Sequence, residues 1–176
     1  KQRPPLYKNQ EETVNYLHGR NATAVLSEQG TGKTRSVIEF INRKYISKQF
    51  RVLVVCPATL MGVWEREVND YADLTDSFML RGPKQKRTKL LKEWKPGWYV
   101  LNYEGIRVLS EKGKSVGQQW DVIICDEMTR IKTPTAKQSK AVHKLAHDNP
   151  QAIRVGITGT PITQSPLDVF SQYLFI

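Results

Sequence analysis

Short apolar runs alternate along the chain with longer segments in which apolar residues recur every three or four positions. Short continuous runs bounded by polar residues are typical of strands buried in a parallel sheet, and the longer pattern is typical of helices that cover one. The runs expected to be strands are 22–26, 51–56, 77–80, 98–101, 122–125 and 153–157. Strands that alternate with helices in this way predict an α/β fold, a three-layer sandwich around a mainly parallel sheet.

Between these runs, three sets of apolar residues fall on one face of a helix. They are Leu60, Val63, Trp64, Val68 and Tyr71, then Leu90, Leu91 and Trp94, and finally Val142, Leu145 and Ala146. This spacing predicts a helix at each place. The stretch 110–119, rich in Gly, Lys and Gln, is expected to be a long exposed loop rather than a domain boundary. A chain of 176 residues has the usual size of one domain, so 1–176 is interpreted as a single domain.

Charge is the first feature that points to a partner. Lys and Arg number 27 against 17 Asp and Glu, which gives a net charge of +10 and favours polyanions as partners. The excess is concentrated in two stretches, 81–95 and 130–144, although a pair of solvated helix faces would have the same composition. Within the second stretch, Lys137, Lys140 and Lys144 recur at helical spacing, so we expect one stripe that contacts a nucleic-acid backbone.

The two cysteines and the length of the apolar runs bear on the compartment. Cys56 and Cys125 each end an apolar run, where a small buried thiol commonly serves as packing, and this usage fits a reducing, intracellular compartment. We expect a cytoplasmic protein in a bacterial or phage-infected cell, or a nuclear one if the source is eukaryotic. The apolar runs are far shorter than the roughly 20 residues that cross a bilayer, so no membrane partner is expected.

A glycine-rich segment, Ser27-Glu-Gln-Gly-Thr-Gly-Lys-Thr34, lies between an expected strand and a helical pattern. Glycines there let backbone N–H groups point at an anion, and the helix N-terminus adds the positive end of its dipole. The segment therefore predicts a phosphate cradle in which Lys33 reaches the β- and γ-phosphates of ATP and the Thr34 hydroxyl joins a Mg²⁺ shell. The residues expected to bind the cofactor here are Gln29, Gly30, Thr31, Gly32, Lys33 and Thr34. The general pattern has glycine where Ser27 stands, and a flexible loop is the alternative interpretation.

Two further segments follow apolar runs directly. Asp126 and Glu127 come after the run 122–125, so we expect Asp126 to hold Mg²⁺ through water and Glu127 to orient and deprotonate the attacking water. Thr158 and Thr160 come after the following run and offer hydroxyl donors on a turn. An acidic turn and a Gly-Pro turn are the alternatives for the two segments taken alone. Because carboxyl ends of parallel strands meet at one edge of a sheet, we expect the acidic pair and the phosphate cradle to lie together.

Taken together and in order, the segments resemble the first RecA-like lobe of a superfamily-two helicase-type ATPase of the Swi/Snf-related class. The segments that carry the resemblance are 6–17, 28–34, 54–60 with Trp64, 100–104, 126–132 and 156–161. The resemblance extends over the whole chain and implies a RecA-like P-loop fold, with ATP and Mg²⁺ as cofactors and double-stranded DNA as the partner. The compact spacing of these segments is more similar to that of phage or mobile-element members than to that of large chromatin remodellers.

The resemblance also implies roles for individual residues. Gln10 is expected to read the adenine edge, and Thr158 with Thr160 to couple the nucleotide to the nucleic acid. The residues expected to contact nucleic acid are Pro57, Thr59, Asn102, Tyr103, Arg130, Lys132, Lys137 and Lys140. Two positions depart from the family pattern. Asn9 replaces an aromatic residue before the adenine glutamine, and Met128-Thr129 replaces the Gly-His or Ala-His that commonly follows the acidic pair.

These implications lead to one functional hypothesis and two alternatives. We expect 1–176 to be the ATP-binding motor lobe of a DNA-dependent ATPase or translocase. It should be weak or inactive alone, because the second RecA-like lobe, which supplies arginine fingers in this family, lies outside it. An RNA or DNA unwinding helicase lobe stays open, since the motifs do not fix the substrate. A nucleotide-gated DNA-binding module without turnover also stays open.

Overall fold

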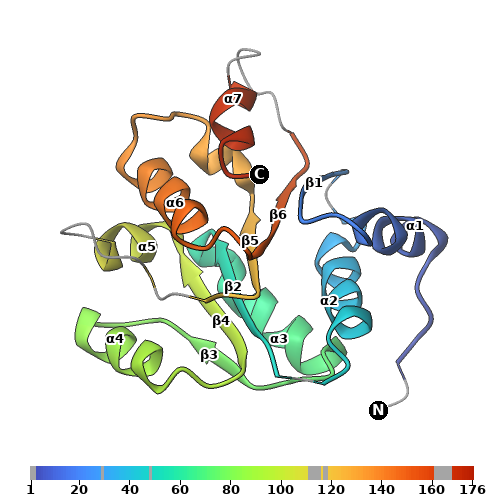
Figure 1. The fold of residues 1–176 in the computed structure, drawn as a ribbon. Coiled ribbons are helices and arrows are strands. Elements are labelled where there is room, and N and C mark those ends of the chain that lie inside the picture. Colours follow the sequence, from blue (N-terminus) through green and yellow to red (C-terminus); the bar gives the residue numbers. More distant parts are fainter. Residues whose placement is uncertain (1–2, 29, 48, 111–115, 117–118, 161–167) are drawn as a thin grey trace.

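A computed structural model describes residues 3–28, 30–47, 49–110, 116, 119–160 and 168–176 (Figure 1). Within these residues, six strands form one sheet in the order β1-β6-β5-β2-β4-β3, and every neighbouring pair is parallel. The strands are β1 (Ala22–Leu26), β2 (Arg51–Cys56), β3 (Ser77–Met79), β4 (Gly97–Asn102), β5 (Val122–Asp126) and β6 (Ile153–Thr158). The predicted α/β fold is confirmed, and each predicted strand ends within about a residue of the observed one, which is the ordinary uncertainty of such boundaries.

Helices cover both faces of the sheet and make it the middle of three layers (Figure 1). They are α1 (Lys8–Leu17), α2 (Lys33–Lys44), α3 (Met61–Tyr71), α4 (Lys84–Glu93), α5 (Tyr103–Leu109), α6 (Lys137–Asp148) and α7 (Asp168–Tyr173), with the short 3₁₀ helices η1 (Ala58–Leu60) and η3 (Met128–Ile131). Alternate residues of a strand point to opposite faces. In β2, Val52 and Val54 share a core with α1, α2 and α3, whereas Leu53 and Val55 share one with α5 and α6. The strands are therefore buried on both sides, as the continuous apolar runs indicate.

Two segments differ from the pattern of well-buried elements. The basic helix α4 has no buried residue, and Leu90 and Leu91 are only half-buried against the second core. The prediction of an exposed loop over 110–119 is wrong at Val116, which is 1% exposed and accepts a hydrogen bond of 2.7 Å from the indole N–H of Trp120. Residues 111–115 and 117–118 lie outside the described part of the chain. Among the helices that the structure describes, none combines the length and the apolar character needed to cross a membrane.

The carboxyl ends of the parallel strands meet at one edge of the sheet, and the segments singled out by their chemistry leave the strands there. The register places Leu26 at the end of β1 beside Thr158 at the end of β6, and Cys56 of β2 beside Asn102 of β4. Strand β5 lies between β6 and β2 and ends at Asp126. Five chain segments therefore emerge side by side, and this edge is where open α/β folds bind their ligands.

Candidate nucleotide-binding and nucleic-acid site

The segment between β1 and α2 has the backbone of a phosphate-binding loop. Gly30 and Gly32 have φ values of +79° and +75°, a left-handed conformation that glycine adopts with little strain. Helix α2 then begins at Lys33, whose ammonium donates to the carbonyl oxygens of Ser27 and Glu28 at 2.6 Å each. Backbone N–H groups and a lysine ammonium therefore gather at a helix N-terminus, where an anion is favoured. Gln29, which the sequence predicts as part of this loop, lies outside the described residues.

The serine at the loop's first position has a structural explanation. The hydroxyls of Ser27 and Thr31 lie 3.0 Å apart, and the Thr31 hydroxyl donates to the carbonyl of Glu28 at 2.9 Å. A glycine at this position could not form the first contact. Ser27, which departs from the general pattern, therefore adds a side-chain hydrogen bond across the loop and leaves the cradle intact.

Gln10 lies directly over the phosphate loop. A Cβ at Gly32 would stand 2.1 Å from the amide nitrogen of Gln10, so this close approach is possible only because residue 32 is glycine. The backbone N–H of Tyr7 donates to the Gln10 side-chain oxygen at 2.9 Å, and the Asn9 amide donates to the carbonyl of Thr31 at 3.3 Å. Two neighbouring residues, Asn9 and Gln10, thus place the start of α1 on the loop, and the bond from Tyr7 fixes the Gln10 side chain.

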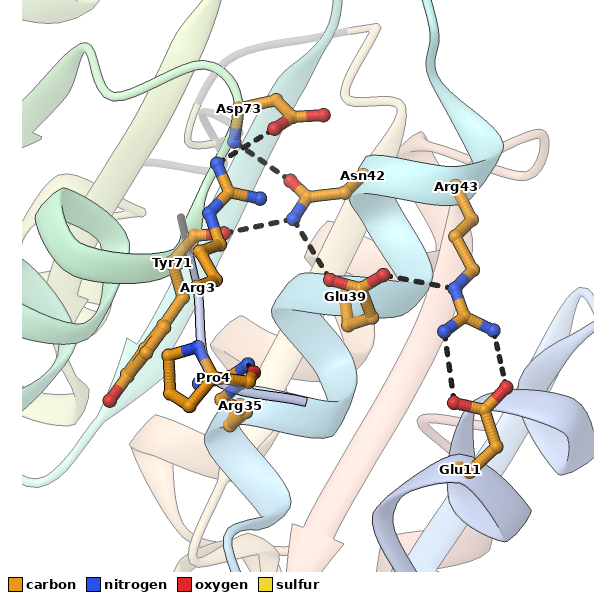
Figure 2. A network of polar contacts seen from close by, with 9 residues as sticks. All are labelled: Arg3, Pro4, Glu11, Arg35, Glu39, Asn42, Arg43, Tyr71 and Asp73. Atoms are coloured by element: carbon orange, nitrogen blue, oxygen red, sulfur yellow. Dashed lines mark hydrogen bonds and ion pairs between the residues drawn. The ribbon is translucent and has the colours of Figure 1, made fainter. Parts of the chain in front are cut away.

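A charged network fastens α1 to α2 at the other end of α2 (Figure 2). Arg43 makes a two-pronged contact with Glu11 of α1, at 2.6 and 2.9 Å, and its Nε donates to Glu39 at 2.9 Å. Arg35 donates to the carbonyl of Pro4 at 2.6 Å and so holds the chain that leads into α1. Planar pairs of this kind fix geometry as well as adding energy. The network therefore helps to define where Gln10 lies.

Asp126 ends β5, is 7% exposed, and accepts hydrogen bonds on both carboxylate oxygens. The indole Nε1 of Trp64 donates to Oδ2 at 2.8 Å, and the backbone N–H of Glu127 donates to Oδ1 at 2.9 Å. Burial raises the pKa of Asp126, these two donors lower it, the Glu127 carboxylate raises it further, and the Lys33 ammonium lowers it. Only β6 separates β5 from β1, so Asp126 and the cradle that follows Leu26 lie at one edge of the sheet, and the effect of Lys33 on the pKa of Asp126 agrees with this placement.

Glu127 stands at a bend between β5 and η3. Its φ of +52° is uncommon for a residue other than glycine, and its side chain is half-buried rather than inside the core. On the neighbouring strand β6, Thr158 is fully buried, and its hydroxyl accepts a hydrogen bond of 3.2 Å from the N–H of Thr160, which is exposed. Thr158, predicted to offer a hydroxyl donor on a turn, is therefore the buried last residue of β6 and its hydroxyl accepts, whereas Thr160 lies beyond the strand; Pro161 lies outside the described residues.

A hollow of about 300 Å³ opens at the same edge, and we call it the edge hollow. Its lining residues are Pro57, Ala58, Thr59, Asn102, Tyr103, Glu104, Arg130 and Gln138. Five of the residues predicted to contact nucleic acid are brought together here. The other three lie outside the lining: Lys137 and Lys140 are exposed on α6, and Lys132 contacts Asp168 of α7 at 3.9 Å.

Two of the lining residues have a different orientation from the one expected of a nucleic-acid contact. Tyr103 is only 5% exposed, and its hydroxyl donates inward to the backbone carbonyl of Asp126 at 2.8 Å. The side-chain oxygen of Asn102 caps α5 by accepting from the N–H of Gly105 at 2.7 Å. Thr59 and Arg130 are both exposed, so they face outward from the hollow, whereas the polar groups of Tyr103 and Asn102 do not.

The sequence did not assign a role to Trp64, Glu104 or Gln138. Helical spacing places Trp64 in the core, which is correct, but nothing in the spacing shows that its N–H reaches Asp126 across 62 positions of sequence. Glu104 ends the motif segment 100–104 and Gln138 belongs to no motif, and both line the hollow because α5 and α6 begin there.

The residues expected to hold Mg²⁺ fit the preferences of that ion. Within the described residues, no three His, Cys, Asp or Glu side chains cluster as a self-contained metal site. Mg²⁺ usually keeps several waters and is held by one or two protein oxygens together with substrate phosphates. Thr34 opens α2 next to Lys33, and Asp126 lies within electrostatic reach of that lysine. Two oxygen ligands at the phosphate cradle match that mode of binding.

A phosphate cradle, an acidic pair that ends a buried strand and a parallel sheet that brings them to one edge define a RecA-like ATP-binding lobe of the helicase type. The SNF2-related domain family model matches residues 9–176, and the chain belongs to that family. The resemblance stated from the motifs is confirmed.

Individual relatives and solved structures agree with this assignment. The ISWI chromatin-remodeling complex ATPase ISW1 of Saccharomyces cerevisiae is 29% identical over 91% of this chain, and the DNA excision repair protein ERCC-6-like of Danio rerio is 29% identical over 97%. The chain spans only 14% and 12% of those two relatives. The Sulfolobus solfataricus SWI2/SNF2 ATPase core in complex with dsDNA has a TM-score of 0.80 at 23% identity, over 99% of this chain and 36% of its own. The Pyrococcus furiosus Hef helicase domain has a TM-score of 0.75 at 16% identity, over 98% and 36%.

Proposed function

We propose that this chain is the ATP-binding motor lobe of a DNA-dependent ATPase that translocates on double-stranded DNA, and that it hydrolyses ATP only weakly by itself. One observation carries the proposal. The cradle of Lys33, the Asp126–Glu127 pair and the edge hollow share one edge of the sheet. A nucleotide and a nucleic-acid backbone bound there would lie on adjacent segments of one rigid sheet.

The roles of the residues follow from their positions. The Lys33 ammonium now donates to two loop carbonyls and would exchange these for phosphate oxygens, with Gln10 beside the loop to recognise the base. Glu127, half-buried and directly after Asp126, would orient a water and accept its proton. Thr34 and Asp126 would hold Mg²⁺, which when bound offsets the negative charge of the phosphates. Thr158 and Thr160 would link this site to the nucleic acid.

Double-stranded DNA is the partner favoured by charge and by structural similarity. A net charge of +10 suits a polyanion, and the exposed Lys137 and Lys140 on α6 add to Arg130 of the edge hollow. The solved core from Sulfolobus solfataricus was determined with dsDNA, which supports the same class of ligand here. An unwinding lobe for RNA or DNA and a nucleotide-gated binding module are the two alternatives.

A second RecA-like lobe would complete the site. Charge that develops on a transferred phosphoryl group is stabilised by an arginine finger, which contributes about 10³ to 10⁵ in rate in related NTPases. We propose that this finger comes from a lobe outside 1–176. The free, buried thiols Cys56 and Cys125 support the expectation of an intracellular, reducing compartment, and a phage or mobile-element source stays a prediction.

The proposal is tested by measuring ATP hydrolysis by residues 1–176 and by the longest natural chain that contains them, with duplex DNA, single-stranded DNA and RNA. We expect duplex DNA to stimulate the long chain, and residues 1–176 to hydrolyse ATP barely above background. Glu127→Gln in the long chain should abolish turnover and leave ATP binding intact, whereas Glu93→Gln at the end of α4 should change neither. Strong DNA-stimulated hydrolysis by 1–176 that disappears in Glu127→Gln would contradict the two-lobe proposal. Stimulation by RNA alone would favour the first alternative.

A further inference from the structure

The side chain of Tyr103 connects the edge hollow to the acidic pair. Tyr103 is the first residue of α5, follows Asn102 directly, and lines the hollow, yet it is almost fully buried. Its hydroxyl donates at 2.8 Å to the backbone carbonyl of Asp126. A side chain that contacts the hollow thus holds the backbone of the candidate catalytic strand.

The carbonyl that Tyr103 holds belongs to the peptide group joining Asp126 to Glu127. The N–H of that same peptide group donates to the Asp126 carboxylate at 2.9 Å. A movement of Tyr103 would therefore tilt this peptide plane and change the direction of the Glu127 side chain. Glu127 already has a φ of +52°, an uncommon conformation that depends on its surroundings to be maintained.

A second side chain makes an equivalent connection from another wall of the hollow. Pro57 and Thr59 lead through η1 into α3, and Trp64 of α3 donates through Nε1 to the Asp126 carboxylate at 2.8 Å. Trp64 is fully buried and its ring lies 6.4 Å from that of Trp98, so it has little room to move alone. Two elements that line the hollow therefore converge on one acidic residue.

The third wall is connected through the backbone. Arg130 lies in η3, three positions after Glu127, and its N–H donates to the Glu127 carbonyl at 2.9 Å. Three of the four segments that line the hollow are thus connected to Asp126 or Glu127 by a hydrogen bond, and the fourth contributes Gln138 of α6. Sites coupled in this way can bias one another only if the linking element differs between the occupied and the free state.

We propose that Tyr103, with Trp64 in support, is a positioning residue that makes the orientation of Glu127 depend on the occupancy of the edge hollow by a DNA backbone. DNA phosphates held against the start of α5 and η1 shift Tyr103 and Trp64. Through Asp126 these two side chains turn the Asp126–Glu127 peptide towards its productive geometry. The inference rests on the proposed function and names how that function would be regulated.

The test uses the longest natural chain and compares Tyr103→Phe with Tyr99→Phe. The two substitutions are matched, because the Tyr99 hydroxyl also donates to a backbone carbonyl at 2.8 Å, that of Lys95, but away from the site. The measured quantities are the ATPase rate without DNA, the rate at saturating duplex DNA, the DNA concentration that gives half of the stimulation, and the thermal midpoint.

For Tyr103→Phe we expect the ratio of the stimulated to the DNA-free rate to fall about fivefold or more, the lower end of measured coupling between sites. The half-saturating DNA concentration and the thermal midpoint should match those of Tyr99→Phe. Trp64→Phe, which keeps an aromatic ring near Trp98 but removes the N–H donor together with part of the buried ring volume, should lower the ratio as well, and its thermal midpoint measures the cost of the lost volume. It provides an independent variant if Tyr103→Phe does not fold.

Two outcomes would overturn the inference alone. The first is a stimulated wild-type protein whose ratio is the same in Tyr103→Phe, Trp64→Phe and Tyr99→Phe. The second is a rise in the half-saturating DNA concentration with full stimulation at saturation, which would make Tyr103 a simple DNA contact. A wild-type chain that DNA does not stimulate would overturn the proposed function, and the inference would fail with it.

Discussion

The sulfur of Met128 occupies the space that a side chain at Gly156 would need. A Cβ built on Gly156 would lie 2.2 Å from the Met128 sulfur and 2.9 Å from its terminal methyl group. Met128 is 2% exposed and directly follows the acidic pair, and Gly156 lies two residues before Thr158 in β6. The methionine that departs from the family pattern is therefore accommodated by a glycine on the neighbouring strand.

The pairing predicts a non-additive effect on stability. Gly156→Ala should lower the free energy of unfolding by about 1–3 kcal/mol, because an added methyl group overpacks a filled core. Met128→Ala should lower it by about 2–5 kcal/mol through the cavity it leaves. In the double variant the new methyl group enters that cavity, so the loss should be smaller than the sum of the two. Denaturant titrations of the four proteins measure this, and simple additivity would show that the two residues do not share the space.

Removal of the Lys33 ammonium should weaken nucleotide binding without unfolding the chain. Lys33→Ala should weaken ATP binding about tenfold or more, since hydrogen bonds to charged groups contribute about 1.5–3 kcal/mol. Lys44→Ala provides a matched control, because Lys44 is exposed at the last position of the same helix. Calorimetry with ATP and Mg²⁺ measures both affinities. Equal affinities for the two variants would contradict the phosphate-cradle assignment.

The lysines of α6 should differ in their contribution to DNA binding. Lys140 is exposed, whereas Lys144 pairs with Asp148 at 2.9 Å. Lys140→Gln should reduce the slope of log affinity against log salt concentration by about 1, the value for one lost phosphate contact. Lys144→Gln should reduce it less, because Asp148 already offsets that charge. Binding to labelled duplex DNA at several salt concentrations gives the slopes, and an unchanged slope for Lys140→Gln would remove α6 from the interface.

The sequence was sufficient to predict the strands and the phosphate loop, because both depend on patterns of neighbouring residues. The strands follow from continuous apolar runs, and the phosphate loop follows from glycines whose φ values of +79° and +75° explain why Gly30 and Gly32 are glycine. Parallel strands then bring Asp126 to the same edge as Lys33, which is a consequence of topology and needs no side-chain detail.

Contacts between segments distant in the sequence could not be predicted in the same way. Trp64 and Tyr103 both reach Asp126, across 62 and 23 positions, and their spacing alone describes ordinary core residues. The resemblance to the family implied that Tyr103 contacts nucleic acid, whereas its hydroxyl points inward. The fit of Met128 against Gly156 likewise depends on the distance between two strands, which no pattern within either strand encodes.

The contact between Arg43 and Glu11 predicts how the stability of the α1–α2 pair depends on pH. A hydrogen bond from Arg43 and its positive charge lower the pKa of Glu11 below its ordinary value of 4.5, although burial raises it slightly. A carboxyl group whose pKa is lowered by folding stabilises the folded state above its unfolded pKa, and this contribution is lost as the pH falls through the lowered value. Glu11→Gln should therefore have a lower thermal midpoint than the wild type at pH 7, and the difference should vanish in acid, below the lowered pKa, where Glu11 is itself protonated.

Glu12→Gln is the matched control, because Glu12 is exposed on the same helix, and it should show no such pH-dependent difference. A difference for Glu11→Gln that stayed constant across this pH range would mean that the ion pair does not hold α1 on α2.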